Sequence, residues 1–141
     1  MITFFSEDIK FNLNQKNRHK AWLRSVASEY NFKIGDLNYI FCSDDYLLNI
    51  NKEYLGHDYF TDIITFDNRD QFFEADKICG DIFISIDTVS ANGTDYGEGF
   101  DRELHRVMSH GLLHLIGFDD HNDEDIVKMR LAEERAIEIY G

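Results

Sequence analysis

The sequence predicts an α+β fold in which a mixed sheet of about four strands is covered by about five helices. Short runs rich in β-branched and aromatic residues alternate with longer segments whose apolar residues recur at helical spacing. The length of 141 residues fits one domain, and a hydrophobic content of 43% is enough for a packed core. We therefore expect a single domain over residues 1–141, with a metal site on its most apolar, central helix.

The expected strands are short and separated by polar segments. They cover residues 2–6, 9–13, 37–42, 62–66 and 80–86. The last of these runs is apolar on both faces, which favours a central place in the sheet. A charged link is expected at residues 71–77.

The expected helices have recognisable ends. The first covers residues 14–29 with Asn14 as its cap, and the second runs from Ser43 to Asn51 or Leu55, where Gly56 follows. A third begins at residue 87 or 90 and frays over 93–99, and a fourth begins near residue 101. The last covers residues 122–140, with Asn122 as cap and acidic residues in the first turn, where the helix dipole favours them.

The fourth helical segment carries a candidate metal site. His110 and His114 stand four residues apart and therefore share one helix face. Gly117 is a natural helix stop, and the turn behind it carries Asp119, Asp120 and His121 back toward the imidazoles. Two histidines on a helix and a third ligand after a turn give the three protein ligands of a catalytic Zn²⁺ site, so one ion per chain is expected. The alternative is a buried pair of core histidines.

The same segment disfavours peptide hydrolysis. Zinc proteases of the His-Glu-x-x-His type carry a general-base glutamate directly after the first histidine. That position is Gly111 here. The pattern therefore indicates a metal site without the catalytic base of those proteases.

The charge distribution limits the possible partners. A net charge of −13 disfavours loose binding to nucleic acid, because such binding depends on Lys and Arg neutralising phosphates. Residues 1–28 carry five basic and two acidic side chains, whereas the remainder carries 9 basic and 25 acidic ones. The candidate RNA-binding surface is therefore the basic first helix, with Lys16, Arg18, Lys20 and Arg24, unless these residues form only a solvated face.

Cellular location is predicted from what the sequence lacks. No signal peptide and no apolar run near the roughly 20 residues of a membrane span is found. Cys42 and Cys79 lie in apolar runs and are expected as buried thiols rather than a disulfide. We expect a soluble cytoplasmic protein with neither membrane nor DNA as a partner.

Three sequence blocks resemble one known family. Residues 110–121 read His-Gly-Leu-Leu-His-Leu-Ile-Gly-Phe-Asp-Asp-His, similar to the signature His-Gly-x-Leu-His-Leu-x-Gly-Tyr-Asp-His of the YbeY family of bacterial rRNA-maturation endoribonucleases. Residues 51–66 resemble the family's Asn-x-x-Tyr-Arg-x-x-Asp-x-Pro-Thr-Asp-Val-Leu-Ser-Phe block, and residues 80–82 its Gly-Asp-Ile strand. The resemblance implies a zinc-dependent endoribonuclease that cleaves single-stranded RNA in 16S rRNA 3′-end maturation and ribosome quality control. Its implied partner is ribosomal RNA or the ribosome, and its catalytic agent is a water on the metal.

The chain departs from the family pattern at two positions. The family's third histidine comes six residues after the second, where this chain has Asp120, with His121 one residue further on. We favour His121 as third ligand, because imidazole is the better zinc donor and a loop absorbs one extra residue, with Asp120 as the alternative. Leu55 replaces an arginine placed to hold an RNA phosphate, and His57 and Arg106 are candidates to take over that contact.

Other polar residues have competing interpretations. Thr61 and Asp62 form either a turn and cap pair or a carboxylate that orients a ligand imidazole. His105 lies off the ligand face, and His19 is expected on the surface of the basic helix. The alternative functions are a ribosome-assembly protein with a structural metal and a metal-dependent hydrolase of another substrate. Coordination separates them, because a fourth protein ligand closes a metal site and an open position serves catalysis.

Overall fold

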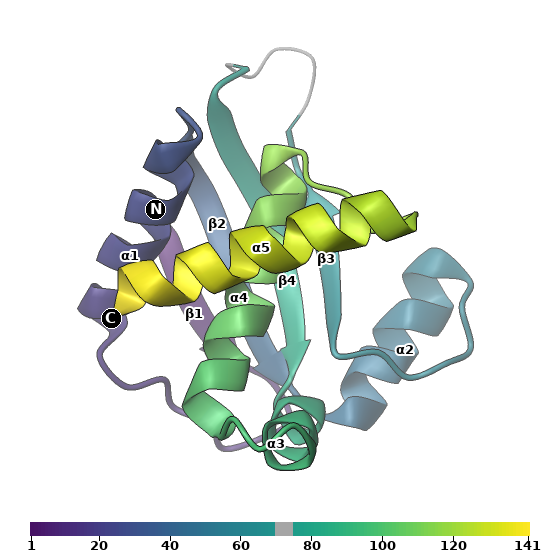
Figure 1. The fold of residues 1–141 in the computed structure, drawn as a ribbon. Coiled ribbons are helices and arrows are strands. Elements are labelled where there is room, and N and C mark those ends of the chain that lie inside the picture. The colour runs from purple at the N-terminus through teal and green to yellow at the C-terminus, as the bar shows by residue number, and fades with distance from the viewer. Residues whose placement is uncertain (70–74) are drawn as a thin grey trace.

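A four-stranded mixed sheet forms the centre of the molecule in the computed structural model, which describes residues 1–69 and 75–141. The strands lie in the order β1-β2-β4-β3 (Figure 1). Their bounds are Ile2–Ser6 for β1, Lys33–Cys42 for β2, Ile63–Asp67 for β3 and Lys77–Ser85 for β4. Strands β1, β2 and β4 run parallel and β3 runs antiparallel to β4, which confirms the predicted mixed sheet.

Five helices in the described residues cover the sheet, as predicted. They are α1 (Lys16–Glu29), α2 (Asp44–Leu55), α3 (Ile86–Asp95), α4 (Phe100–Ile116) and α5 (Asp123–Tyr140). Helix α4 lies across one face of the sheet, and α5 crosses over α4 on the outer side (Figure 1). Helix α4 therefore lies between the sheet and α5, which confirms its central place. No helix in the described ranges is long and apolar enough to cross a membrane.

Strand β4 has apolar side chains on both faces because both faces are covered. Successive side chains along a strand alternate between faces. Ile82 and Ile84 join the main core beneath α4, whereas Phe83 packs with Leu47 of α2 in a second cluster. The predicted central position of this strand is thus confirmed, and its hydrogen-bonded neighbours are β2 and β3.

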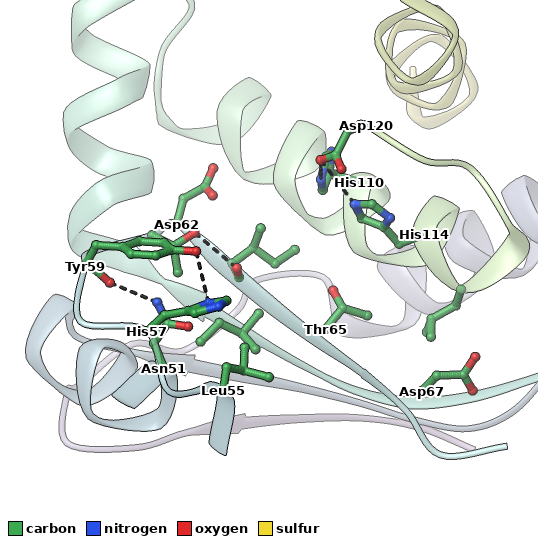
Figure 2. Close-up of a pocket in the computed structure, with 14 residues that line it drawn as sticks. Asn51, Leu55, His57, Tyr59, Asp62, Thr65, Asp67, His110, His114 and Asp120 are labelled. Carbon is green, nitrogen blue, oxygen red and sulfur yellow. Dashed lines mark hydrogen bonds and ion pairs between the residues drawn. The ribbon is translucent and has the colours of Figure 1, made fainter. Parts of the chain in front are cut away.

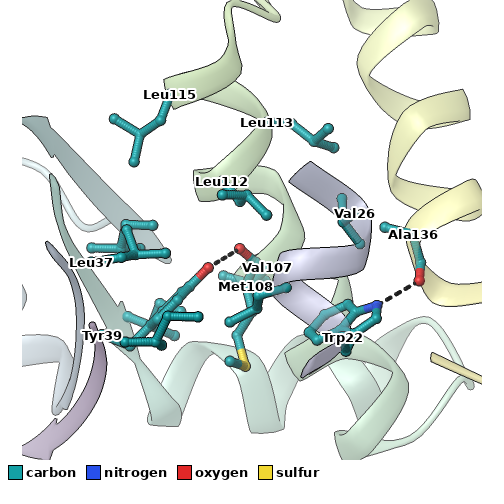
Figure 3. Packing of buried hydrophobic residues seen from close by; sticks show 14 of the residues in the cluster. Trp22, Val26, Leu37, Tyr39, Val107, Met108, Leu112, Leu113, Leu115 and Ala136 are labelled. Atoms are coloured by element: carbon teal, nitrogen blue, oxygen red, sulfur yellow. Dashed lines mark hydrogen bonds between the residues drawn. The ribbon is translucent and has the colours of Figure 1, made fainter. Parts of the chain in front are cut away.

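Two buried hydrogen bonds tie the core to the helices (Figure 3). The hydroxyl of Tyr39 donates to the carbonyl of Met108 in α4 at 2.8 Å. The indole of Trp22 in α1 donates to the carbonyl of Ala136 in α5 at 2.8 Å. These polar tips of large apolar side chains fix how the sheet and the helices dock.

Two helix caps follow the predictions. The side chain of Ser43 accepts from the amide of Tyr46, and the side chain of Asn122 accepts from the amide of Asp125. The predicted Asn14 cap is wrong, because α1 begins at Lys16 and its cap position, Gln15, has left-handed backbone geometry without a side-chain cap bond.

The strand predicted at residues 9–13 is not formed. This segment pairs with no strand, and its apolar side chains cover the edge of the core instead. The ring of Phe11 lies 5.0 Å from that of Phe41, and Leu13 is buried. Most of the charged link predicted at 71–77 lies outside the described residues, and β4 begins at Lys77. Cys42 and Cys79 are buried free thiols, as predicted.

Candidate metal and active site

His110 and His114 project from the same face of α4 toward the turn that follows it (Figure 2). Their ring centroids are 4.7 Å apart. The Oδ2 atom of Asp120 lies 3.6 Å from Nε2 of His110 and 3.4 Å from Nε2 of His114. One donor atom from each of the three residues therefore falls within 4.8 Å of the others, which is close enough to surround one ion.

Gly111 allows α4 to lie close to the sheet. A Cβ atom at this position would lie 2.9 Å from Cγ2 of Ile82 and 3.0 Å from Cδ1 of Ile63. Such distances are well inside ordinary carbon contacts of about 3.5–4.0 Å. A glutamate directly after the first histidine, as in the zinc proteases, would therefore crowd the sheet here, and the sequence has none.

Gly117 ends α4 with a positive φ of 127° and lets the chain turn back. The turn brings Asp120 to the histidine pair, whereas the exposed His121 is grouped with Asp119 and Asp120 and not with the pair. Nε2 of His121 lies 3.0 Å from Asp119, and its side chain is 80% exposed. The structure thus groups the alternative third ligand, Asp120, with the pair and leaves the favoured one, His121, outside. Neighbouring residues in an extended turn project in different directions, so only one of them reaches the pair.

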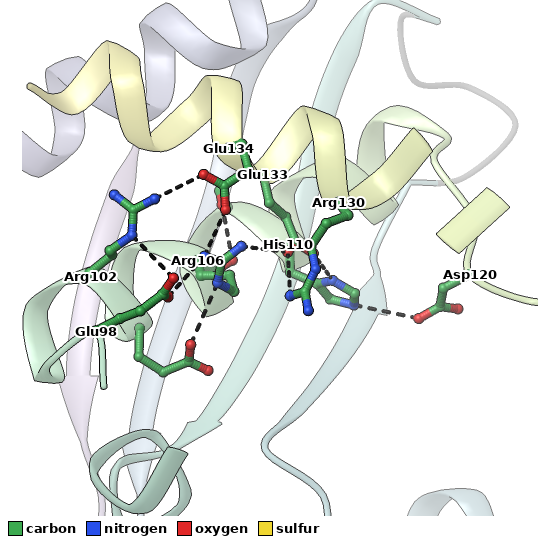
Figure 4. Close-up of polar contacts among 10 residues, drawn as sticks. Glu98, Arg102, Arg106, His110, Asp120, Arg130, Glu133 and Glu134 are labelled. Carbon is green, nitrogen blue, oxygen red and sulfur yellow. Dashed lines mark hydrogen bonds and ion pairs between the residues drawn. The ribbon is translucent and has the colours of Figure 1, made fainter. Parts of the chain in front are cut away.

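Glu133 of α5 fixes the orientation of His110 (Figure 4). Its Oε2 atom lies 2.7 Å from Nδ1 of His110, and its side chain is only 6% exposed. A carboxylate on one ring nitrogen of a histidine holds the proton there and leaves the other nitrogen free to bind a metal. Burial lowers the pKa of His110, but the hydrogen bond and charge of Glu133, together with Asp62 and Asp120, outweigh it and raise that pKa above its usual value.

Arg106 lies behind this carboxylate in a buried ion-pair network. Its side chain is 9% exposed and lies within ion-pair distance of four carboxylates, those of Glu98, Glu103, Glu133 and Glu134. Burial lowers the pKa of Arg106, but the hydrogen bonds and charges of Glu134 and Glu98 outweigh it and raise the pKa above its usual value. The guanidinium is thus held by ion pairs within the protein. Arg106 is absent from the lining of the cavity beside His114, but it lines a second cavity, of about 420 Å³, that His110 and Asp120 also line. The phosphate contact predicted for Arg106 stays a prediction.

The ligand group opens onto a cavity of about 460 Å³ between α2, β3 and α4. Leu55 and His57 line the same cavity, as do Thr61 and Asp62. Burial raises the pKa of Asp62 despite the opposing charge of His110. One interpretation of Asp62 was that its carboxylate orients a ligand imidazole. In the structure Glu133 makes that hydrogen bond to His110.

The basic residues of α1 lie apart from this cavity. Lys16, Arg18 and Arg24 are exposed, and Lys20 is half-buried. None of the four lines the cavity that contains His110 and His114. Arg18 donates to the carbonyl of Tyr140 at 2.9 Å and stacks over that ring.

His19 is buried rather than on the surface, which corrects the prediction from sequence. Its Nε2 atom lies 3.2 Å from Nε2 of His105, and its Nδ1 atom lies 3.0 Å from the carbonyl of Gln15. The reason is the docking of α1 onto α4, which places the two imidazoles together beneath Tyr140. The prediction that His105 lies off the ligand face agrees with this position.

Sequence reasoning missed Glu133 and Tyr59. Glu133 belongs to α5, and no local spacing relates it to His110. The aromatic content of residues 54–60 was the available signal for Tyr59, which lines the cavity opposite the ligand group (Figure 2).

Comparisons with known proteins show which family the chain resembles over its whole length. A family model described as Endoribonuclease YbeY matches residues 1–141. A protein of that name from Phocaeicola vulgatus is 44% identical over 141 residues, covering 100% of this chain and 99% of the relative. Another from Cytophaga hutchinsonii is 46% identical over 138 residues, covering 98% of this chain and 94% of the relative.

A solved structure shares the fold. The solution structure of a Thermotoga maritima protein aligns with a TM-score of 0.68 at 24% sequence identity. The alignment covers 99% of this chain and 89% of that one. The α+β architecture is therefore one that a natural protein is known to adopt.

Proposed function

Because this chain belongs to the endoribonuclease YbeY family, we propose that it is a zinc-dependent endoribonuclease that cleaves single-stranded RNA. Residues 1–141 form its catalytic domain, and its place of action is the cytoplasm. Its substrate is ribosomal RNA, in 16S rRNA 3′-end maturation and ribosome quality control, with the ribosome as partner.

The observation that carries this proposal is the convergence of His110, His114 and Asp120 at the wall of an open cavity. Two imidazoles and one carboxylate form a ligand set that suits Zn²⁺ at a catalytic site with an open position. The residues fit such an ion, because Glu133 accepts from Nδ1 in the neutral form of His110, which makes Nε2, the nitrogen facing Asp120, the metal donor. When bound, the ion supplies a Lewis acid for a phosphoryl oxygen and makes water more acidic.

The other side chains of the site orient the metal ligands and line the place where a phosphodiester would bind. Glu133 keeps the proton on Nδ1 of His110, and Asp120 closes the ligand set from the turn. Asp62 lies on the cavity wall near His110, where burial favours its protonated form. The cavity has a volume of about 460 Å³, which leaves room for part of an RNA strand.

Cleavage of a labelled single-stranded RNA tests the activity. Protein loaded with one equivalent of Zn²⁺ is expected to cut it, and His114→Ala protein treated in the same way is expected not to. A matched control is His121→Ala, which removes an exposed histidine outside the ligand group. Equal cleavage by wild-type and His114→Ala proteins would overturn the proposal.

A competitive chelator titration tests the ligand set. Asp120→Ala is expected to lower zinc affinity far more than His121→Ala, because only Asp120 lies near both imidazoles. The reverse order would identify His121 as the third ligand. Equal metal content in wild-type and His110→Ala/His114→Ala proteins would remove the metal site itself.

The basic residues of α1 form the second part of the proposal. Lys16, Arg18, Lys20 and Arg24 contact RNA phosphates at a distance from the cavity, so a bound strand passes over both surfaces. Replacing the four with Ala is expected to weaken binding for every RNA sequence and to flatten its dependence on salt, since fewer counterions are released. An unchanged affinity and salt slope would exclude α1 from the RNA path.

A further inference from the structure

Exposed aromatic side chains lie on one wall of the metal cavity and directly beside it in the sequence. This aromatic rim comprises His57 and Tyr59, which line the cavity, and Phe60, which follows Tyr59 in the chain. The side chains of Tyr59 and Phe60 are 57% and 59% exposed. Apolar side chains left in water beside a functional cavity mark a surface that a ligand covers.

The rim is held in place rather than free to collapse. The amide of the buried Asn51 side chain donates to the carbonyl of Tyr59 at 2.9 Å. The rings of His57 and Tyr59 stack with centroids 5.1 Å apart and an interplanar angle of 18°, and the Tyr59 hydroxyl lies 3.0 Å from Nδ1 of His57. These contacts hold the nearly parallel rings of His57 and Tyr59 in place, and the side chain of Tyr59 stays exposed to solvent.

The cavity offers few cations to attract phosphate. Its described lining contains three aspartates, Asp62, Asp67 and Asp120, and neither lysine nor arginine. The nearby guanidinium of Arg69 binds Asp67 at 2.6 Å and the carbonyl of Leu115 at 2.7 Å. Contacts that depend on base faces therefore suit this wall better than contacts that depend on backbone charge.

We propose that the aromatic rim binds unpaired nucleobases by stacking, with Tyr59 as the principal platform and Phe60 beside it. The inference rests on the proposed function and extends it to the basis of substrate choice. Every base has a flat face, so stacking accepts any sequence. It requires bases that are free of a helix, so the rim selects single-stranded RNA over duplex.

Binding in a chelating buffer separates this inference from catalysis. The chelator prevents metal-dependent cleavage of the RNA. Binding of a labelled single-stranded oligonucleotide to the full chain is then measured by fluorescence anisotropy. Tyr59→Ala is expected to raise Kd about tenfold, within the range for removing one stacking aromatic. Its salt slope is expected to stay unchanged, because stacking releases no phosphate counterions. Tyr59→Phe keeps the ring and is expected to bind nearly as well as wild type.

Phe5→Ala is the matched control. Phe5 is an aromatic side chain, 47% exposed, on β1 at the opposite edge of the sheet from β3. A probe of the same length that lacks bases is expected to bind weakly to wild type. Tyr59→Ala is expected to bind this abasic probe with the same Kd as wild type. A duplex of the same strand is expected to bind weakly to both.

Three results would overturn the inference. The first is that Tyr59→Ala and Phe5→Ala have the same Kd. The second is that wild type binds duplex and single strand equally well. The third is that Tyr59→Phe loses as much affinity for the oligonucleotide as Tyr59→Ala. In the cleavage assay Tyr59→Ala is expected to raise KM and to retain kcat. Absence of cleavage by zinc-loaded wild type, with the binding results as expected, would instead refute the proposed function and leave the stacking surface intact.

Discussion

Replacing Gly111 with alanine tests how tightly α4 is packed against the sheet. In an exposed helix this change is stabilising by about 1 kcal/mol, because glycine is a poor helix former. Here the new Cβ would meet Cγ2 and Cδ1 of Ile82 and Cδ1 of Ile63 at 2.9–3.0 Å. A β-branched side chain in a strand cannot rotate its Cγ2 away freely, so the helix has to move outward.

Two opposing contributions decide whether Gly111→Ala stabilises or destabilises the protein. Overpacking a dense core costs about 1–3 kcal/mol, which exceeds the gain in helix propensity. We therefore expect Gly111→Ala to lower the free energy of unfolding by up to about 2 kcal/mol, the cost of overpacking less the gain in helix propensity. We also expect weaker zinc binding, because the displacement moves His110 and His114 relative to Asp120.

Urea denaturation measures the first effect, as a lower midpoint at an unchanged m-value. Ile63→Val serves as the companion variant, because it removes one of the atoms that the new Cβ would meet. It is expected to cost about 0.5–1.5 kcal/mol alone and less in the Gly111→Ala background. A Gly111→Ala protein more stable than wild type by about 1 kcal/mol would refute the packing argument, since only helix propensity would then be acting.

Three further predictions concern buried polar groups. Glu133→Gln is expected to lower zinc affinity about 10- to 100-fold in a chelator titration, whereas Glu134→Gln on the outer side of the network leaves it unchanged. Burial lowers the pKa of His105 to about 4, so the unfolded chain binds more protons between pH 4 and about 6.5, and stability is lost as pH falls through that window. In urea titrations over that pH range, the free energy of unfolding of His105→Gln is expected to fall less than that of wild type. Trp22→Phe deletes the hydrogen bond to the carbonyl of Ala136 and is expected to lower the free energy of unfolding by about 1–2 kcal/mol, measured by urea denaturation at pH 7.

The sequence by itself determined the features that depend on neighbouring residues. The spacing of His110 and His114 placed both imidazoles on one helix face, because an α-helix repeats every 3.6 residues. Ser43 and Asn122 mark helix starts, because their side chains bond amides three residues away. The apolar character of residues 80–86 predicted a strand covered on both faces, as β4 is.

Only the tertiary structure decided which distant groups meet. The direction of the turn after Gly117 brings Asp120 rather than His121 to the histidine pair, and the crossing of α5 over α4 brings Glu133 to His110. The docking of α1 likewise buries His19, which the local pattern of the basic helix had placed in solvent. Spacing along one element fixes which side chains share a face, but contacts between elements depend on how whole helices pack, and packing depends on the complete core.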